Sequence, residues 1–318
     1  PPPPPPRRYR QAIESLDPDY AAGMLGIAEG SGFDPDEIAA LNVRYEIMYS
    51  RFGAMATAAE RAVDGCTAFA VLPESSANAH AYLGQNWDWI PQVRCAVLQT
   101  AEPGALETLA FTEAGIFGGK IGLNAAGLGL CVNGMTTTDD DGDALLLPFH
   151  ARCRRALRSA TLEEGMRAFT DGNRACAGNF LLAHADGCAV DLETAPFAVR
   201  ALTPTGGRLV HTNHFLDPGV LGVTEPPMER RPWSCHRLNR FGALLSAMGP
   251  ATPEALMEAL RDHDGKPFSV CRHEDWSEPP SEHYITVSSI VMDLTERRLW
   301  LTDGPPCGSS YQPSALAL

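Results

Sequence analysis

The character of the sequence changes at one point, and this change constrains the fold more than any other feature. Residues 7–65 carry apolar side chains at helical spacing, whereas short segments typical of strands begin directly after Cys66. Beyond them, helices, strands, helices and strands are expected in alternating blocks. This order favours an α+β domain in which helices pack on sheets. No linker in the 318 residues requires two domains.

The start of one N-terminal helix is readable in residues 34–37. Asp34 can cap, Pro35 fits the first turn, and Glu37 completes a capping box. Apolar side chains then recur at steps of three and four and predict one buried stripe of a single amphipathic helix. They are Ile38, Leu41, Tyr45, Met48 and Phe52.

The rest of the chain predicts the following elements. Strands are expected at 68–72, 81–85, 93–100, 106–111, 208–211, 284–292 and 298–302, with a glycine-rich strand region at 115–134. Residues 179–192 predict a hairpin that turns at Asp186-Gly187. Two helices are expected after the polar, acidic loop 136–143, with a capping box at Thr161 for the second, and further helices are expected over 232–248 and over 253–261, the last one capped by Thr252.

Charge limits the partners of the protein. The formal net charge is −14, which argues against nucleic acid because phosphates require a surplus of Lys and Arg. One local basic group stands out at helical spacing, and we expect it to form a solvated helix face. It consists of Arg152, Arg154, Arg155 and Arg158.

The nine cysteines are scattered and include no C-x-x-C pair. This pattern argues against a zinc knuckle or a disulfide scaffold, and it suits a reducing compartment. We therefore expect a cytoplasmic protein without a metal or another cofactor. No apolar run approaches the ~20 residues of a membrane span. The six prolines at the start are treated as a tail.

Cys66 follows Gly65 at the boundary between the helical and the strand regions. A glycine tolerates strained backbone angles and leaves its carbonyl open to attack by the next side chain. The Cys66 thiol could attack this carbonyl and form a thioester that water cleaves. The new chain would begin at Cys66, with an α-amine of ordinary pKa ~7.7–8.0 beside the thiol. One residue would then supply both nucleophile and base.

Several motifs resemble the acyl-coenzyme A:6-aminopenicillanate acyltransferase family of N-terminal-nucleophile hydrolases. Asp64-Gly65-Cys66-Thr67, followed by Gly84-Gln85-Asn86-Trp87-Asp88, carries the resemblance most specifically. The segments 41–44, 122–133, 211–214 and 267–272 agree with it, so the resemblance extends over roughly residues 25 to 305.

This resemblance implies a four-layer αββα sandwich. It implies self-cleavage between Gly65 and Cys66. Residues 1–65 would be a helical propeptide that stays as a small subunit on the catalytic domain, residues 66–318.

The resemblance also implies roles for single residues. Cys66 is the nucleophile, and Asp88 orients its freed α-amine. Asn213 donates its side-chain NH2 to the oxyanion. Asn133 is a second polar position near the oxyanion or the substrate. Arg272 lies near the nucleophile, where its charge favours the thiolate.

The predicted activity is cleavage of a small amide through an acyl-enzyme thioester on Cys66, with water favoured over an amine as acceptor. One alternative is acyl-coenzyme A-dependent N-acyl transfer of the penicillin type. Another is a binding protein of the same fold that has lost self-cleavage. Ala68 favours the latter, since the fungal penicillin-forming members have a second threonine there. Whether the chain forms a homo-oligomer stays open.

Two further readings use the histidines. A papain-like site would pair Cys66 with His211 or His214 as base. A metal site would use His211 and His214, with Asp217 as a third ligand. The spacing of that pair at a strand end does not suit two ligands on one helix face.

Overall fold

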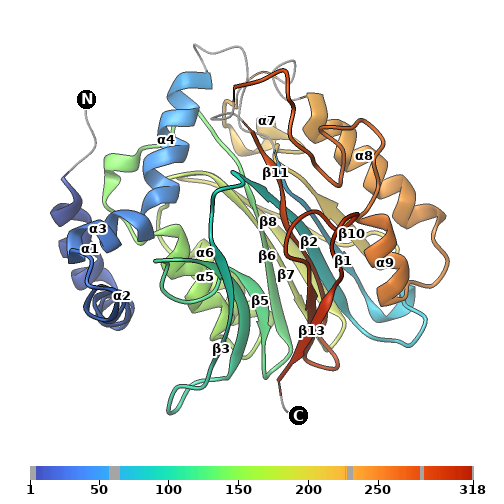
Figure 1. The fold of residues 1–318 in the computed structure, drawn as a ribbon, viewed down its shortest axis with the longest axis horizontal. Coiled ribbons are helices and arrows are strands. Elements are labelled where there is room, and N and C mark those ends of the chain that lie inside the picture. The colour runs from blue at the N-terminus through green and yellow to red at the C-terminus, as the bar shows by residue number, and fades with distance from the viewer. Residues whose placement is uncertain (1–4, 57–64, 226, 228–231, 280–282, 317–318) are drawn as a thin grey trace.

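The computed structural model describes residues 5–56, 65–225, 227, 232–279 and 283–316, and only the backbone of 51–56. Two antiparallel sheets face each other in this part of the chain, with helices on their outer faces (Figure 1). The predicted αββα sandwich of the α+β class is therefore confirmed.

The first sheet has the strand order β10-β1-β2-β11-β12-β13. Its strands are β10 (Arg208–His211), β1 (Thr67–Val71), β2 (Tyr82–Trp89), β11 (Ile285–Asp293), β12 (Arg298–Leu301) and β13 (Gln312–Ala315). The second sheet has the order β3-β4-β5-β6-β7-β8-β9. Its strands are β3 (Cys95–Thr100), β4 (Thr108–Glu113), β5 (Ile121–Asn124), β6 (Leu128–Gly134), β7 (Gly178–His184), β8 (Cys188–Thr194) and β9 (Val199–Leu202).

Helices cover both sheets. α8 (Pro232–Ala247) and α9 (Pro253–Ala259) pack on the first sheet, and α5 (Phe149–Leu157) and α6 (Leu162–Thr170) pack on the second. The short α7 (Pro218–Leu221) follows β10. Four N-terminal helices lie to one side of the layers (Figure 1). They are α1 (Pro6–Leu16), α2 (Pro18–Ser31), α3 (Pro35–Asn42) and α4 (Arg44–Ala56).

The main core fills the space between the sheets and continues under α5 and α6. A second core joins Phe69 of β1 to Phe241 and Leu256 of the covering helices. Gly84 on β2 permits this packing, because a Cβ there would lie 2.5 Å from the Phe69 ring and 2.7 Å from the Ile290 carbonyl oxygen.

The prediction of one helix across residues 35–52 is wrong, because the chain breaks at Val43 between α3 and α4. The cause is the buried side chain of Asn42. It donates to the Gly115 carbonyl at 2.8 Å and accepts from the Phe117 backbone N–H at 2.9 Å. These tertiary bonds fix the end of α3 and redirect the chain.

The prediction of a solvated arginine face on α5 is also wrong for two of its four members. Arg152 is buried and donates to the carbonyls of Leu147, Ala168, Asp171 and Asn173. Arg154 is buried and bonds Asp19 and Glu102. Burial of these charges is tolerated because every guanidinium finds several acceptors.

Most local predictions are confirmed. Asp34 and Glu37 form a capping box, and Thr161 and Thr252 cap α6 and α9. The hairpin of β7 and β8 turns at the expected place. β9 and β13 were not predicted, since they are edge strands with exposed or half-buried side chains. Among the described residues, none of the helices combines the length and apolar character needed to cross a membrane.

Candidate active site

Cys66 stands at the head of β1, and the β1–β2 hairpin returns Asp88 to it. The register pairs Thr67 with Asn86, so Asp88 lies just beyond the start of β1. The Cys66 Sγ atom is 3.8 Å from the Asp88 carbonyl oxygen. A Cβ on Gly65 would lie 3.3 Å from the Asp88 Cβ. Cys66 and Asp88 are both buried. Asp64 of the same motif lies outside the described residues.

Asn213 lies directly after β10 and contacts the backbone in front of Cys66. Its Oδ1 atom accepts from the Gly65 backbone N–H at 3.2 Å, and its Nδ2 atom donates to the Gly134 carbonyl at 3.0 Å. In the unbroken chain the amide therefore spans from Gly65 to the end of β6. Its use as an oxyanion donor stays a prediction.

Arg237 of α8 is a site residue that sequence reasoning missed. Its guanidinium donates to the Cys66 carbonyl oxygen at 2.5 Å, to Thr67 Oγ1 at 3.1 Å and to Asn213 Oδ1 at 3.2 Å. The side chain is fully buried. A usable signal exists in the sequence, since this arginine falls in the buried stripe of α8 together with Ser234, Phe241 and Leu245.

Arg272 reaches the site through its backbone. Its N–H donates to Thr286 Oγ1 at 2.9 Å, and Thr286 Oγ1 donates to Asp88 Oδ1 at 2.7 Å. The guanidinium lies over the ring of Tyr284, 5.7 Å from the centroid. Its proposed effect on the thiolate stays a prediction.

Asn133 is buried on β6, between the pocket-lining residues Val132 and Gly134. Its Oδ1 atom accepts from Asn179 Nδ2 at 3.1 Å, and Asn179 Nδ2 also donates to Asp191 Oδ1 at 2.7 Å. The Nδ2 atom of Asn133 has no hydrogen-bond partner among the described residues. This amide therefore keeps a donor available between the sheets.

A pocket opens beside the Cys66 thiol, with an empty volume of about 500 Å³ that includes its opening to solvent. Aromatic rings and cations form much of its wall. The lining residues are Arg44, Tyr45, Tyr49, Gly65, Cys66, Trp87, Asp88, Trp89, Lys120, Val132, Gly134, Phe149, His150, Asn213 and Tyr284. Several of them come from α4, so the N-terminal segment forms part of this wall.

The electrostatics of the pocket are set by burial and by the charged side chains around it. Burial and the nearby Asp88 raise the pKa of the Cys66 thiol to about 11, against the opposing charges of Arg237 and Lys120. Burial also acts to raise the pKa of Glu113, but Lys120 and Arg44 outweigh it and lower that pKa to about 2. The carboxylate therefore pairs with both cations, which leaves a surplus of one positive charge in this group.

The geometry supports neither the papain-like site nor the metal site considered for His211 and His214. His211 Nε2 lies 3.1 Å from Glu193 Oε1, and His214 Nδ1 lies 2.7 Å from Ser234 Oγ. Asp217 caps α7 by accepting from the Val220 N–H. Each group is thus engaged within its own surroundings, and among the described residues the three do not form a group that could hold a metal ion.

An αββα sandwich with a cysteine at the head of β1 defines an N-terminal-nucleophile hydrolase fold. The solved structures agree. The chain resembles the Caenorhabditis elegans N-acylethanolamine-hydrolyzing acid amidase ortholog with a TM-score of 0.53 at 15% identity, covering 72% of this chain and 93% of that one. It resembles a variant of the conjugated bile acid hydrolase from Clostridium perfringens with a TM-score of 0.51 at 11% identity, covering 79% and 97%.

The family follows from the sequence comparisons. Residues 75–306 match the family described as acyl-coenzyme A:6-aminopenicillanic acid acyl-transferase. The acyl-coenzyme A:6-aminopenicillanic-acid-acyltransferase 40 kDa form of Emericella nidulans is 30% identical over 310 residues, which cover 94% of this chain and 79% of that protein. The chain belongs to this acyltransferase and amidohydrolase family of enzymes.

Proposed function

We propose that the chain cuts itself between Gly65 and Cys66 and then cleaves a small amide with Cys66 as its N-terminal nucleophile. One observation carries the proposal. The Gly65–Cys66 junction is held at the head of β1 by Asn213 on one side and Arg237 on the other, and both residues of the junction line the pocket.

Self-cleavage would begin with attack of the Cys66 sulfur on the Gly65 carbonyl carbon. The C–N bond breaks, a thioester forms, and the thiol proton passes to the nitrogen that becomes the α-amine. Water then cleaves the thioester, leaving a carboxylate on Gly65 and a free thiol on Cys66. Asp88, within reach of this junction, would orient the new amine.

The acidity of the thiol is expected to differ between the self-cleavage step and the catalytic cycle. A thiol with a pKa of about 11 is protonated at neutral pH in the unbroken chain. Cleavage would place an α-ammonium beside it, and a neighbouring cation lowers the pKa of a thiol. The thiolate that attacks the substrate would therefore form more readily after the cut, whereas the self-cleavage attack starts from the protonated thiol, whose proton passes to the leaving nitrogen.

In the catalytic cycle, the Cys66 thiolate would attack the carbonyl carbon of the amide. The oxyanion would rest on Asn213 and backbone N–H groups, with Asn133 as a second donor. The α-ammonium would give its proton to the leaving amine, and an acyl thioester would remain. Water, activated by the neutral amine, would then release the acid.

The N-terminal segment would stay bound after the cut as the small subunit, residues 1–65. Its contacts with residues 66–318 support this. Glu46 Oε1 accepts from the Phe149 N–H at 2.6 Å, and Tyr45 donates to the Ala177 carbonyl at 2.7 Å. Arg155 pairs with Asp17 at 2.8 Å. Loss of this segment would remove one wall of the pocket.

The pocket wall favours an amide whose acyl part is apolar or aromatic. Tyr45 stacks on both Tyr49 and Phe149, with ring centroids 4.0 and 3.9 Å apart. The three rings line the same pocket as Cys66, and aromatic side chains bind apolar groups well. We take hydrolysis as the main outcome, since water is always present.

Gel electrophoresis and intact mass test the proposal. The wild type should separate into fragments 1–65 and 66–318, and Cys66→Ala should remain one chain. Cys131→Ala, which removes another buried thiol, should be cut like the wild type. A wild type that stays whole and is fully active would show that the proposed base does not exist.

The acceptor needs a second measurement. A panel of acyl amides and acyl-coenzyme A thioesters, with and without a competing amine, separates hydrolysis from transfer. Acyl-coenzyme A-dependent transfer is the alternative favoured by the name of the Emericella relative. A burst of the first product supports the acyl-enzyme, whereas strictly sequential kinetics contradict it. Complete inertness with every substrate would favour a binding protein, the reading suggested by Ala68.

A further inference from the structure

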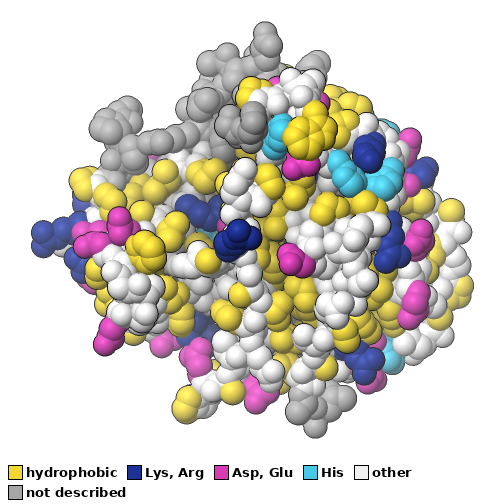
Figure 2. Space-filling view, in the orientation of Figure 1, with side chains coloured by type: hydrophobic (Ala, Val, Ile, Leu, Met, Phe, Trp, Pro, Cys, Tyr) yellow, Lys and Arg dark blue, Asp and Glu magenta, His cyan; other side chains and the backbone are white. Residues whose placement is uncertain are grey.

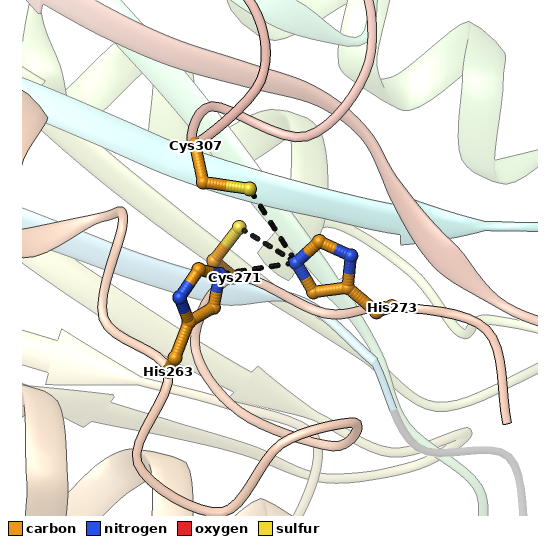
Figure 3. A group of neighbouring side chains, drawn as sticks. All are labelled: His263, Cys271, His273 and Cys307. Carbon is orange, nitrogen blue, oxygen red and sulfur yellow. Dashed lines mark hydrogen bonds between the residues drawn. The ribbon is translucent and has the colours of Figure 1, made fainter.

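Four metal-ligand side chains, three from residues 263–273 and one from the loop that contains Cys307, converge at the surface near α9. His263 follows α9, Cys271 and His273 lie in the loop before β11, and Cys307 lies in the loop between β12 and β13. Figure 3 shows the two imidazoles and two sulfurs pointing toward one another. Their ligand atoms all lie within 4.8 Å of one another. Histidine side chains are also visible on the molecular surface on the side of α8 (Figure 2).

We propose that these four residues form a structural zinc site. The spacing of their atoms carries the proposal. The Nε2 atoms of His263 and His273 are 3.0 Å apart, and His273 Nε2 is 3.6 Å from Cys271 Sγ and 3.5 Å from Cys307 Sγ. Tetrahedral zinc with Zn–S of about 2.3 Å and Zn–N of about 2.0–2.1 Å places N–N pairs about 3.3 Å and N–S pairs about 3.6 Å apart.

Hydrogen bonding alone explains this arrangement poorly. The dashed lines in Figure 3 run from one nitrogen, His273 Nε2, to all three partners. A ring nitrogen carries either one proton or one lone pair, so it can satisfy one such partner well. A cation among the four atoms would satisfy all of them.

The backbone holds the ligands in place independently of their side chains. The Cys271 N–H donates to the Asp262 carbonyl at 3.0 Å, and the His273 N–H donates to the Pro267 carbonyl at 2.9 Å. Arg261 Nε donates to the Pro306 carbonyl at 2.9 Å and so joins the two loops. A site prepared in this way loses little entropy when the ion binds.

The ligand set selects the metal. Two thiolates and two imidazoles form a closed four-ligand set with no open position, which is the composition of structural rather than catalytic zinc sites. Cys271 is buried, His273 is half-buried, and His263 and Cys307 are exposed. The ion would therefore enter from solvent without unfolding of the domain.

The site would also fix the chain on both sides of Arg272. The Arg272 N–H is one hydrogen bond from Thr286 Oγ1, and Thr286 is one hydrogen bond from Asp88. Bound zinc would thus hold the Arg272 backbone in place and, through Thr286, help to position the Asp88 side chain. Only this consequence, not zinc binding itself, rests on the proposed function.

The test uses the full chain without an affinity tag. Reduced protein is given zinc sulfate, passed through a desalting column and analysed for metal by mass spectrometry. Wild type and Cys188→Ser, which removes an exposed thiol elsewhere, should retain about one zinc per chain. His263→Ala and Cys307→Ser should lose it, and both positions are exposed, so the variants should fold. Cobalt should give the thiolate-to-metal absorption of a tetrahedral site in the wild type and not in these variants.

Three outcomes would overturn the proposal. The wild type could fail to retain zinc, or both ligand variants could retain as much as the wild type. Intact mass could instead show that Cys271 and Cys307 are joined as a disulfide in protein that was offered zinc. Self-cleavage is followed in the same samples, so failure of the zinc site and failure of the proposed function give separate readouts.

Discussion

Arg237→Met should lower the free energy of unfolding of the domain, because it removes a buried side chain that donates hydrogen bonds to several groups at the head of β1. The arginine donates to the Cys66 carbonyl, to Thr67 Oγ1 and to Asn213 Oδ1. A hydrogen bond from a charged donor contributes about 1.5–3 kcal/mol. These bonds share one guanidinium and are not additive. We therefore expect a loss of about 3–5 kcal/mol in the free energy of unfolding, since several buried acceptors lose their donor at once.

The assay is thermal unfolding of Arg237→Met in the Cys66→Ala background, so that cleavage does not confuse the comparison. The expected loss corresponds to a fall in Tm of about 10 °C, since 1 kcal/mol shifts the Tm of a large domain by about 2–4 °C. Arg240→Met is the matched control. It lies one turn further along α8 and forms a partly exposed pair with Asp262, so its Tm should change little.

Equal Tm values for the two arginine variants would refute the reasoning. It would mean that water or a rearranged neighbour replaces the three bonds at no cost. In the wild-type background, Arg237→Met should also slow the cut at Gly65–Cys66, because the Cys66 carbonyl would lose its charged donor.

Three other perturbations test separate parts of the structure. Burial raises the pKa of Glu46 to about 7, so this group stabilises the fold below its ordinary pKa and loses that contribution as pH rises through 7. Urea unfolding of Glu46→Gln should therefore shift by about 2–3 kcal/mol in favour of the variant between about pH 5 and pH 8, and a constant difference would contradict this. Gly84→Ala should lower the free energy of unfolding by at least about 3 kcal/mol, since its Cβ meets Phe69 and a backbone oxygen. The control Gly26→Ala in α2, where a Cβ meets nothing within 4 Å, should raise it by about 0.5–1 kcal/mol. Equal urea midpoints for the two variants would contradict the described packing around Gly84. Asn213→Ala should lower kcat by about 10²–10³ if its amide stabilises the oxyanion, and an unchanged kcat would assign the oxyanion to other donors.

Sequence alone determined the features that depend on short stretches of chain. The capping box of Asp34 and Glu37, the caps at Thr161 and Thr252 and the β7–β8 hairpin follow from turn chemistry over a few residues. The αββα layering was expected only from the resemblance to the family. The motifs around Cys66 and Asp88 were also readable, because the hairpin that joins them is local. Asn213 came only from the resemblance to the family, since nothing near it in the sequence points to Cys66.

Only the tertiary structure decided where charge and polar groups are buried. The break at Val43 depends on bonds from Asn42 to residues far along the chain. Arg237 became a site residue because the packing of α8 on the first sheet brings its guanidinium within hydrogen-bond distance of the Cys66 carbonyl at the head of β1. The cluster of His263 and Cys307 forms because the loop after α9 meets the loop between β12 and β13. A charged or metal-binding side chain can be buried only where other groups bind it, and those groups come from elements that no local sequence pattern connects.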